Sequence, residues 1–345
     1  MPEVLVTGGS GFFGGLLKRQ LLDRGFSVTS LDLVQDGDRH PALSSVRGDI
    51  RDRELLDSLF ASHRFTAVFH IAAMLAHGGV KDDVLWTSNV DGTRNLAEAV
   101  RRHGVRKIIF TSSNCLWGRN PGHPIREDEP PAPVELYGRS KLADEQILAE
   151  YRGDFEAIIL RCPTIISGGR LGLLAILFEF IQEGRTVWVV GDGSNRYQFV
   201  YAPDLAEACM AALQYSGSDV FHVGSDGVES VREVYEAVIH RAGTRSRVRS
   251  LPKRATLAAM RLAYRLGLSE LGPYHYRMIA EDFRFDTTRI KRKLGWRPTL
   301  SNAEMLSQAY EYYARSRREI EARTDVSAHS RPAAMGIIRL LKWIS

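Results

Sequence analysis

Apolar runs with the length of buried β-strands recur through the first half of the chain. They lie at residues 3–6, 27–32, 67–72, 107–112 and 157–161. Amphipathic stretches with helical periodicity separate these runs, and the clearest of them are residues 52–62, 88–102 and 135–151. Strands that alternate with helices in this way form a parallel sheet with helices packed on both faces. The pattern therefore predicts an α/β protein with a doubly wound parallel sheet.

The alternation becomes irregular after residue 163. Two short apolar runs, 187–190 and 220–223, are flanked by amphipathic stretches near 203–214 and 230–242. We expect this part to form a smaller C-terminal α/β lobe at the carboxyl edge of the sheet, where doubly wound folds bind substrates.

The chain is accordingly divided into three parts. They are a first domain over 1–163, a region over 164–323 that is mainly the smaller substrate lobe with some chain returning to the first domain, and a linker with an amphipathic tail over 324–345.

Composition narrows the class of protein without indicating its chemistry. The 345 residues are 44% hydrophobic and 25% charged, and the formal net charge is +5, as in an ordinary globular enzyme. Met1 leads almost directly into the first strand, and no apolar run has the length of a membrane span. Three widely spaced cysteines, Cys115, Cys162 and Cys209, fit neither a disulfide framework nor a metal site. We expect a cytoplasmic protein that binds neither metal nor nucleic acid.

A glycine-rich turn joins the first predicted strand to the first helix. Gly8, Gly11 and Gly14 follow the apolar run 4–6 and overlap the start of the apolar-periodic segment 12–22. Glycine permits a sharp turn and a close approach of backbone to phosphate, and the helix start offers free N–H groups and a positive dipole end. We predict a pyrophosphate cradle for a dinucleotide in a Rossmann-type sheet.

An acidic residue at the end of the second strand sets the expected cofactor. Asp32 closes the run 27–32, and Leu33 follows it in place of a basic residue. A carboxylate at this distance from the glycine turn accepts hydrogen bonds from the adenosine ribose and repels a 2′-phosphate. The sequence therefore favours NAD(H) over NADP(H).

A tyrosine and a lysine share one face of a predicted helix. Tyr137 and Lys141 are four residues apart, and residues at this spacing are neighbours on a helix surface. A phenol is a poor base at neutral pH, but a nearby ammonium favours its phenolate form. The pair is suited to taking a proton from an alcohol as hydride leaves, and to returning it. Ser112 and Ser113, just after a strand, offer hydroxyls to the same substrate oxygen.

These features resemble the extended short-chain dehydrogenase/reductase superfamily, and within it the NAD-dependent epimerase/dehydratase family of UDP-galactose 4-epimerase. The matching segments are spread over most of residues 1–316. They are Thr7-Gly-Gly-Ser-Gly-Phe-Phe-Gly14, Gly48-Asp49-Ile50, His70-Ile-Ala-Ala73, Asn89-Val-Asp-Gly-Thr93, Phe110-Thr-Ser-Ser-Asn-Cys-Leu-Trp-Gly118, Tyr137-x-x-x-Lys141, Arg161-Cys-Pro163, Gly191-Asp-Gly-Ser194, Phe285-Asp-Thr287 and Lys293-Leu-Gly-Trp-Arg-Pro298. The set is specific for fold and cofactor and poorly specific for substrate.

The resemblance implies a role for each matching residue. Asp49 and Ile50 would contact adenine, while Ala72 and Ala73 would line the path of the pyrophosphate. Ser113 occupies the place of the family's catalytic Ser/Thr, and Lys141 would also hold the nicotinamide ribose. The implied catalytic residues are Ser113, Tyr137 and Lys141. The implied cofactor-binding residues are Gly8, Gly11, Phe12, Phe13, Gly14, Asp32, Asp49, Ile50, Ala72, Ala73, Asn89, Tyr137, Lys141 and Pro163.

Departures from the family's motifs narrow the range of reactions that the protein is expected to catalyse. Dehydratases and decarboxylases of the superfamily carry a carboxylate at the position of Cys115, and dehydratases add an acid at the position of Asn114, so both reactions are disfavoured. GDP-fucose synthases use a cysteine at the place of Cys115, but their partner histidine is replaced by Arg170, which cannot release a proton near neutral pH. Cys115 is therefore expected to be a wall of the site.

A second departure concerns the diphosphate of a nucleotide substrate. The position at which 4-epimerases place a diphosphate-binding arginine holds Tyr197, and Arg196 lies one residue away. Either the Arg196 side chain extends to the diphosphate from the neighbouring position, or the substrate has no diphosphate there. The predicted substrate-binding residues are Ser112, Asn114, Cys115, Arg170, Arg196 and Tyr197.

Two enzyme functions and one binding function are compatible with these residues. The leading interpretation is an NAD-dependent epimerase of a nucleotide sugar, acting at C4 through a transient 4-keto intermediate. The alternative is an oxidoreductase like 3β-hydroxysteroid dehydrogenase that acts on a hydrophobic alcohol or ketone, which Tyr197 and the apolar segment 252–279 favour. A non-catalytic NAD-sensing protein is the third class, and the intact Ser113, Tyr137 and Lys141 set disfavours it.

The resemblance also implies an assembly. Relatives commonly pair as homodimers through the helices expected at 88–102 and 135–151. Apolar residues expected at that contact are Leu96, Ala97, Val100, Leu142, Ile147 and Leu148. The amphipathic end, 335–345, suggests docking on a second subunit or a weak peripheral contact with a membrane.

Overall fold

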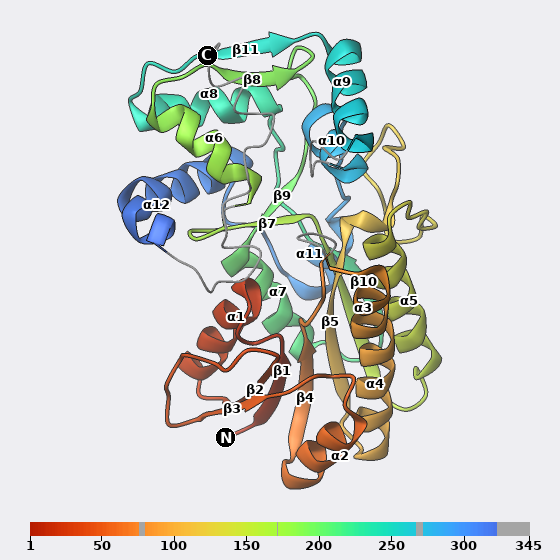
Figure 1. The fold of residues 1–345 in the computed structure, drawn as a ribbon. Helices are drawn as coiled ribbons and strands as arrows, with labels where there is room; N and C mark the ends of the chain where they lie inside the picture. The colour runs from red at the N-terminus through yellow and green to blue at the C-terminus, as the bar shows by residue number, and fades with distance from the viewer. Residues whose placement is uncertain (76–79, 171, 267–271, 323–345) are drawn as a thin grey trace.

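A seven-stranded parallel sheet forms the larger part of the computed structural model, which describes residues 1–75, 80–170, 172–266 and 272–322 (Figure 1). The strand order is β10-β6-β5-β4-β1-β2-β3. The strands are β1 (Glu3–Thr7), β2 (Ser27–Asp32), β3 (Leu43–Arg47), β4 (Phe65–His70), β5 (Lys107–Ser113), β6 (Glu156–Cys162) and β10 (Asp219–His222). The order reverses direction beside β1, which is the doubly wound arrangement that the sequence predicts.

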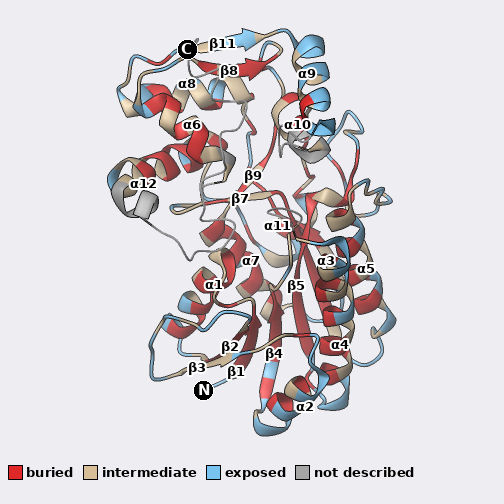
Figure 2. Ribbon diagram, in the orientation of Figure 1, coloured by how far each residue is buried: buried red, intermediate tan, exposed pale blue. Residues whose placement is uncertain are grey.

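Helices cover both faces of this sheet, and each face has its own apolar core. One face carries α1 (Phe12–Asp23), α7 (Ala202–Gln214) and α11 (Thr288–Leu294). The other carries α2 (Arg53–Ser62), α4 (Gly92–Arg102) and α5 (Leu136–Glu150). The central strands are buried between the two layers (Figure 2), so their apolar runs need no alternation of polar residues. A short helix α3 (Asp82–Trp86) and a π-helical turn (Thr87–Asp91) lead into α4.

The second lobe lies beyond the carboxyl ends of the strands (Figure 1). Its two parallel strand pairs are β7 (Thr164–Ile166) with β9 (Phe199–Tyr201), and β8 (Val187–Val190) with β11 (Val248–Leu251). Its helices are α6 (Leu173–Gln182), α8 (Val231–Ala242), α9 (Lys253–Arg265), α10 (Pro273–Ala280) and α12 (Asn302–Ala322). A capping box between Ser230 and Glu233 starts α8, and Gly243 ends it in the left-handed conformation, as local helix signals require. A third apolar core joins α6, α8 and α12.

One predicted element lies in a different place from that expected. The run 220–223 was assigned to the smaller lobe, but β10 pairs with β6 in parallel and forms the edge of the main sheet. The expectation was wrong because a short apolar run indicates a buried strand without indicating which sheet it joins. Helix α7 likewise packs on the main sheet, so chain from the second half returns to the first domain.

The predicted dimer contact also needs correction. Leu96, Ala97, Val100, Ile147 and Leu148 are buried in the core beneath α4 and α5. They cannot supply apolar surface to a second subunit, because the apolar stripe of a surface helix faces its own sheet. The homodimer itself stays a prediction. The tail beyond residue 322 lies outside the described residues, and within the described ones no helix has the length and apolar composition to cross a membrane.

Candidate active site

The glycine turn between β1 and α1 is shaped for close backbone contacts. Gly8 has a φ of +75°, and a Cβ atom there would lie 2.8 Å from the Ala72 Cα atom. A Cβ atom on Gly14 would lie 2.0 Å from the Gly8 carbonyl oxygen. Any larger residue at either position would displace the backbone, so the turn brings β1, the 71–72 segment and α1 together at one point. Gly8 and Ala72, two predicted cofactor residues, are therefore neighbours.

The beginning of α1 fits an anionic group. Gly11 is the N-cap residue and supplies no capping side chain, and the first turn, which starts with Phe12 and Phe13, contains no acid. The first N–H groups of a helix need acceptors, and the positive end of the helix dipole favours negative charge there. A pyrophosphate bound at this turn would satisfy both requirements.

Asp32 is held at the end of β2 by two backbone groups. Its carboxylate accepts hydrogen bonds from the Ser10 N–H at 3.0 Å and from the Val34 N–H at 3.1 Å. These bonds connect the glycine turn with the loop after β2, and they fix the orientation of the carboxylate. The position suits recognition of a ribose diol.

The loop after β2 is fixed from beneath by a buried lysine that the sequence analysis missed. Lys18, on α1, is 1% exposed and forms ion pairs with Asp36 and Asp38. The Ser30 hydroxyl also donates to Asp36, at 2.8 Å. The Lys18 ammonium lowers the pKa of the Asp38 carboxyl. The signal that could have revealed these ion pairs is that Lys18 lies three and four residues before Leu21 and Leu22, on the buried face of α1.

Three further predicted cofactor residues, Asp49, Ile50 and Pro163, make the following contacts. Arg51 pairs with the Asp49 carboxylate and lowers its pKa. Ile50 packs directly beneath Gly92, where a Cβ atom would lie 2.6 Å from it. Pro163 follows the end of β6 and is buried.

Asn89 connects the cofactor cleft with α5. Its side chain accepts from the Met74 N–H at 2.7 Å and donates to the Met74 carbonyl at 3.1 Å and to the Ser140 hydroxyl at 2.9 Å. Ser140 in turn donates to the Tyr137 carbonyl. Asn89 therefore sets the position of the 72–74 segment relative to the helix that carries Tyr137 and Lys141.

Helix α5, which carries Tyr137 and Lys141, lies directly against the end of β5 and the turn after it. Lys141 donates to the Thr111 carbonyl at 3.1 Å. A Cβ atom on Gly138 would lie 2.2 Å from the Cys115 carbonyl oxygen, so only glycine allows this approach. Between these two contacts the Ser113 hydroxyl accepts from the Cys115 N–H at 3.1 Å. The helix that carries Tyr137 and Lys141 is thus packed against the segment that carries Ser113.

Comparison with known proteins agrees with this geometry. A family model described as the NAD-dependent epimerase/dehydratase family matches residues 4–224. The UDP-glucose 4-epimerase of Mycolicibacterium smegmatis is 32% identical over 333 residues, which are 90% of this chain and 98% of that protein. The uncharacterized protein y4nG of Sinorhizobium fredii is 36% identical over 345 residues, 99% of this chain and 86% of that protein. The crystal structure of Thermotoga maritima UDP-glucose 4-epimerase with UDP-glucose has a TM-score of 0.76 at 25% identity, and covers 91% of this chain and 99% of that one.

The chain belongs to the NAD-dependent epimerase/dehydratase family. It is an enzyme of that family, and its cofactor is NAD. The fold class, the family and the cofactor predicted from the sequence are thereby confirmed. The individual site residues stay predictions, supported by the geometry above.

On the substrate side of this epimerase-family site, the structure brings together two predicted residues. The Asn114 amide donates to the Tyr197 hydroxyl at 2.7 Å, and both side chains are buried. Cys115 is half-buried beside Gly138. Arg170 lies over the Phe12 ring, with its Cζ atom 5.9 Å from the ring centroid, and so it approaches the glycine turn from the second lobe.

Two other predicted substrate residues are engaged elsewhere. The Ser112 hydroxyl donates to Glu145 on α5 at 2.6 Å, and Glu145 is bound by Arg161 at 2.7 Å. All three are buried, so Ser112 contributes to a structural network beneath the site. Arg196 is exposed, and its guanidinium donates to the Val228 carbonyl. Neither geometry supports a direct contact with substrate.

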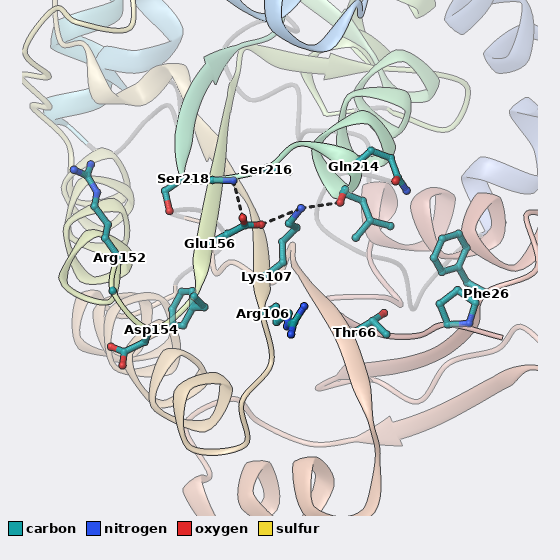
Figure 3. A pocket seen from close by; sticks show the side chains of 15 residues that line it. Phe26, Thr66, Arg106, Lys107, Arg152, Asp154, Glu156, Gln214, Ser216 and Ser218 are labelled. Carbon is teal, nitrogen blue, oxygen red and sulfur yellow. Dashed lines mark hydrogen bonds and ion pairs between the residues drawn. The ribbon is translucent and has the colours of Figure 1, made fainter.

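A separate groove lies at the opposite end of the sheet, where the strands begin (Figure 3). It has a volume of about 780 Å³ and none of the predicted site residues lines it. Its central lysine, Lys107, donates to the carbonyls of Leu213 and Tyr215 and pairs with Glu156. These contacts fasten the end of α7 to the sheet, which is a structural role. No cluster of His, Cys, Asp or Glu within the described ranges could hold a metal ion.

Proposed function

We propose that this protein is an NAD-dependent nucleotide-sugar epimerase that inverts C4 through a transient 4-keto sugar. One observation carries the proposal: α5, the helix of Tyr137 and Lys141, packs against the end of β5 and against the turn after Ser113. An alcohol bound where α5 contacts the end of β5 would have a base, a cation and a hydroxyl group beside it.

The relatives support a nucleotide sugar as the substrate. The M. smegmatis relative is named a UDP-glucose 4-epimerase, and the T. maritima structure of that enzyme contains UDP-glucose. The T. maritima chain aligns with 91% of this one, and the alignment therefore includes much of the second lobe. We propose a UDP-sugar as the first substrate to examine.

The chain's own residues would perform the proton chemistry as follows. Bound NAD supplies a hydride acceptor that returns the hydride to the same carbon. Tyr137, as phenolate, would take the proton of the C4 hydroxyl and give it back to the 4-keto oxygen. The Lys141 ammonium would stabilise the phenolate, since a nearby positive charge favours the ionised form of a phenol. Ser113 would donate a hydrogen bond to the same sugar oxygen, and so hold it in line with Tyr137.

The segment after Ser113 argues against elimination reactions. Asn114 and Cys115 stand where a dehydratase would need acids, and the Asn114 amide is already bound to Tyr197. Neither position carries the carboxylate with which a dehydratase removes a C5 proton or protonates a leaving hydroxyl. The 4-keto sugar is therefore expected to be reduced again and released as the epimer.

The test is epimerisation without added cofactor. Purified protein would be incubated with UDP-glucose, UDP-galactose, their N-acetyl forms and UDP-glucuronic acid, then with GDP-, CDP- and dTDP-sugars, and products would be resolved by NMR. Interconversion of one C4 pair in D₂O, without deuterium at C4, is expected because the same hydride returns. Failure of every sugar to interconvert would remove the proposal. Steady accumulation of NADH with an added alcohol would favour the oxidoreductase alternative instead.

A further inference from the structure

Lys141 has an acidic neighbour on its own helix that the proposed mechanism does not use. Asp144 follows one turn later, and its Oδ2 atom lies 4.0 Å from Lys141 Nζ. The two side chains are 2% and 1% exposed. The Lys141 ammonium also lies 4.4 Å from the centre of the Phe110 ring. Burial lowers the pKa of Lys141, and Asp144 is the strongest of the groups that oppose this effect.

A row of hydrogen bonds leads from Ala72 to Thr93, whose side chain favours the ionised form of Asp144. The Ala72 N–H donates to the Thr7 hydroxyl at 3.3 Å, and Thr7 Oγ1 lies 2.8 Å from His70 Nδ1. His70 Nε2 lies 2.9 Å from the Thr93 hydroxyl, and the Thr93 side chain lowers the pKa of the Asp144 carboxyl, against the effect of burial.

The order of donors in this row follows from what each group can give. Each hydroxyl has one hydrogen. Thr93 can satisfy an ionised Asp144 only by donating to it, and it must then accept from a protonated His70 Nε2. His70 Nδ1 then accepts from Thr7. The row is complete with His70 neutral and Asp144 ionised, and burial keeps His70 neutral by lowering its pKa to about 3. All the dipoles in the row therefore point their positive ends toward Asp144.

The other titratable groups around Lys141 are occupied or neutral. On α5, Glu145 is held by Arg161 and Ser112, and Tyr137 lies one turn before the lysine. On β6, burial raises the pKa of the Cys162 thiol to about 12, so it stays uncharged. On β4, His70 is neutral. Among the described residues, Asp144 is thus the acidic group that faces Lys141 and whose charge is not neutralised by another cation.

We propose that Asp144 is the counter-ion of Lys141, a positioning residue that keeps the lysine protonated while Thr93 and His70 orient and stabilise its carboxylate. This inference rests on the proposed function, because it assigns a purpose to the charge of Lys141 in that mechanism. It also adds a connection between Ala72, at the cofactor cleft, and the lysine of the reaction site.

The contacts and the charge of Asp144 do not fit a purely structural role. Asp144 Oδ1 accepts no hydrogen bond from the described residues, and burial raises the pKa of Asp144 to about 6. Keeping this carboxylate ionised at neutral pH therefore does not stabilise the fold, and an uncharged residue of the same size would suit the core better. A buried charge retained under these conditions is expected to serve the site.

The first experiment compares the pH dependence of kcat in Asp144→Asn and the native enzyme. Without its counter-ion Lys141 loses its proton more easily. The alkaline limb of the profile should therefore move to lower pH by about one unit or more. Thr93→Val removes the hydroxyl that supports the carboxylate and should shift the limb in the same direction by less. Thr93→Ser keeps the hydroxyl and is the matched control, with a native profile. A normalised Asp144→Asn profile that superimposes on the native one would overturn the proposal.

The second experiment does not depend on activity. Unfolding free energies of the native protein, Lys141→Met, Asp144→Asn and the double variant form a double-mutant cycle at pH 8. A counter-ion pair predicts that the double variant is more stable than the sum of the single effects, and additive effects would contradict it. If no sugar is epimerised but coupling is found, the ion pair stands and the proposed function fails. Coupling without any pH shift in an active enzyme leaves only a structural role, and so overturns the proposal.

Discussion

The side chains of Asn114 and Tyr197 meet through a hydrogen bond of 2.7 Å in the buried interior. Asn114 begins the turn after β5, and Tyr197 belongs to the segment that leads into β9 of the second lobe. The bond therefore fastens the reaction site to the substrate lobe. It also explains why a tyrosine can occupy a position where related 4-epimerases place an arginine: here the side chain organises the site from within.

Replacing Tyr197 by phenylalanine should weaken substrate binding more than cofactor binding. The change leaves the buried Asn114 amide without its acceptor, a loss of about 1–3 kcal/mol in the free energy of unfolding. We expect KM to rise by about tenfold with NAD content unchanged. Tyr215→Phe is the matched control, since it loses a bond to Asp219 far from the site and should lower stability without changing KM. Equal effects of the two variants on KM would contradict this role.

Two adjacent glycines of α1 should respond in opposite ways to alanine. At Gly14 the new methyl group would lie 2.0 Å from the Gly8 carbonyl, whereas at Gly15 the nearest atom would be 3.5 Å away. Gly14→Ala is expected to displace the cradle and to be purified without NAD. Gly15→Ala should keep NAD and gain about 0.5–1 kcal/mol of stability from its higher helix propensity. The measurement is the NAD content of the denatured proteins, and a normal content in Gly14→Ala would refute the prediction.

Asp32 should determine the preference for NAD(H) over NADP(H). Its carboxylate is oriented by Ser10 and Val34, and it would meet a 2′-phosphate as a like charge. Asp32→Ser is expected to reduce the ratio of the two dissociation constants by about tenfold or more. Asp52→Ser is the control, because Asp52 is a nearby acid that only caps α2 and serine can replace it as a cap. A native protein that binds both cofactors equally would sink the assignment.

Tyr137→Phe tests the proton transfer itself. The phenylalanine keeps the ring but cannot exchange a proton, so turnover should fall by about 10²-fold or more. NAD should remain bound, because the cradle and Asp32 are untouched. Turnover would be measured by NMR on the sugar found to interconvert, with Tyr151→Phe, at the C-cap of the same helix, as the control. Near-normal turnover in Tyr137→Phe would remove the mechanism.

His70 should make the fold sensitive to acid. Its pKa is lowered to about 3 by burial and by Lys141, whereas an unfolded histidine titrates near 6.5. The unfolded chain therefore binds the extra proton first, and stability is lost as the pH falls below about 6.5. Glutamine does not titrate. The difference in the free energy of unfolding between the native protein and His70→Gln should therefore shrink between pH 6.5 and 4, by on the order of 3 kcal/mol. Urea unfolding at several pH values checks this, and a deficit of His70→Gln that stays constant with pH would contradict it.

Local signals in the sequence determined the framework of this protein and the chemistry at its centre. The apolar runs predict β1, β2, β4, β5 and β6 within a few residues of their observed bounds. The glycine turn, Asp32 and the Tyr137–Lys141 spacing each depend on a few consecutive residues, and that is why they could be recognised along the chain. By contrast β3, with a half-exposed and largely polar sequence, has no apolar pattern and was missed.

Only the tertiary structure decided how distant segments meet. It placed β10 beside β6, buried Lys18 beneath the loop after Asp32, joined Asn114 to Tyr197, and set Asp144 beside Lys141 in the interior. The physical reason is that periodicity along a chain specifies which face of an element is buried. The partners of a buried polar group are set by the packing of elements far apart in sequence, where each donor and acceptor must be satisfied together.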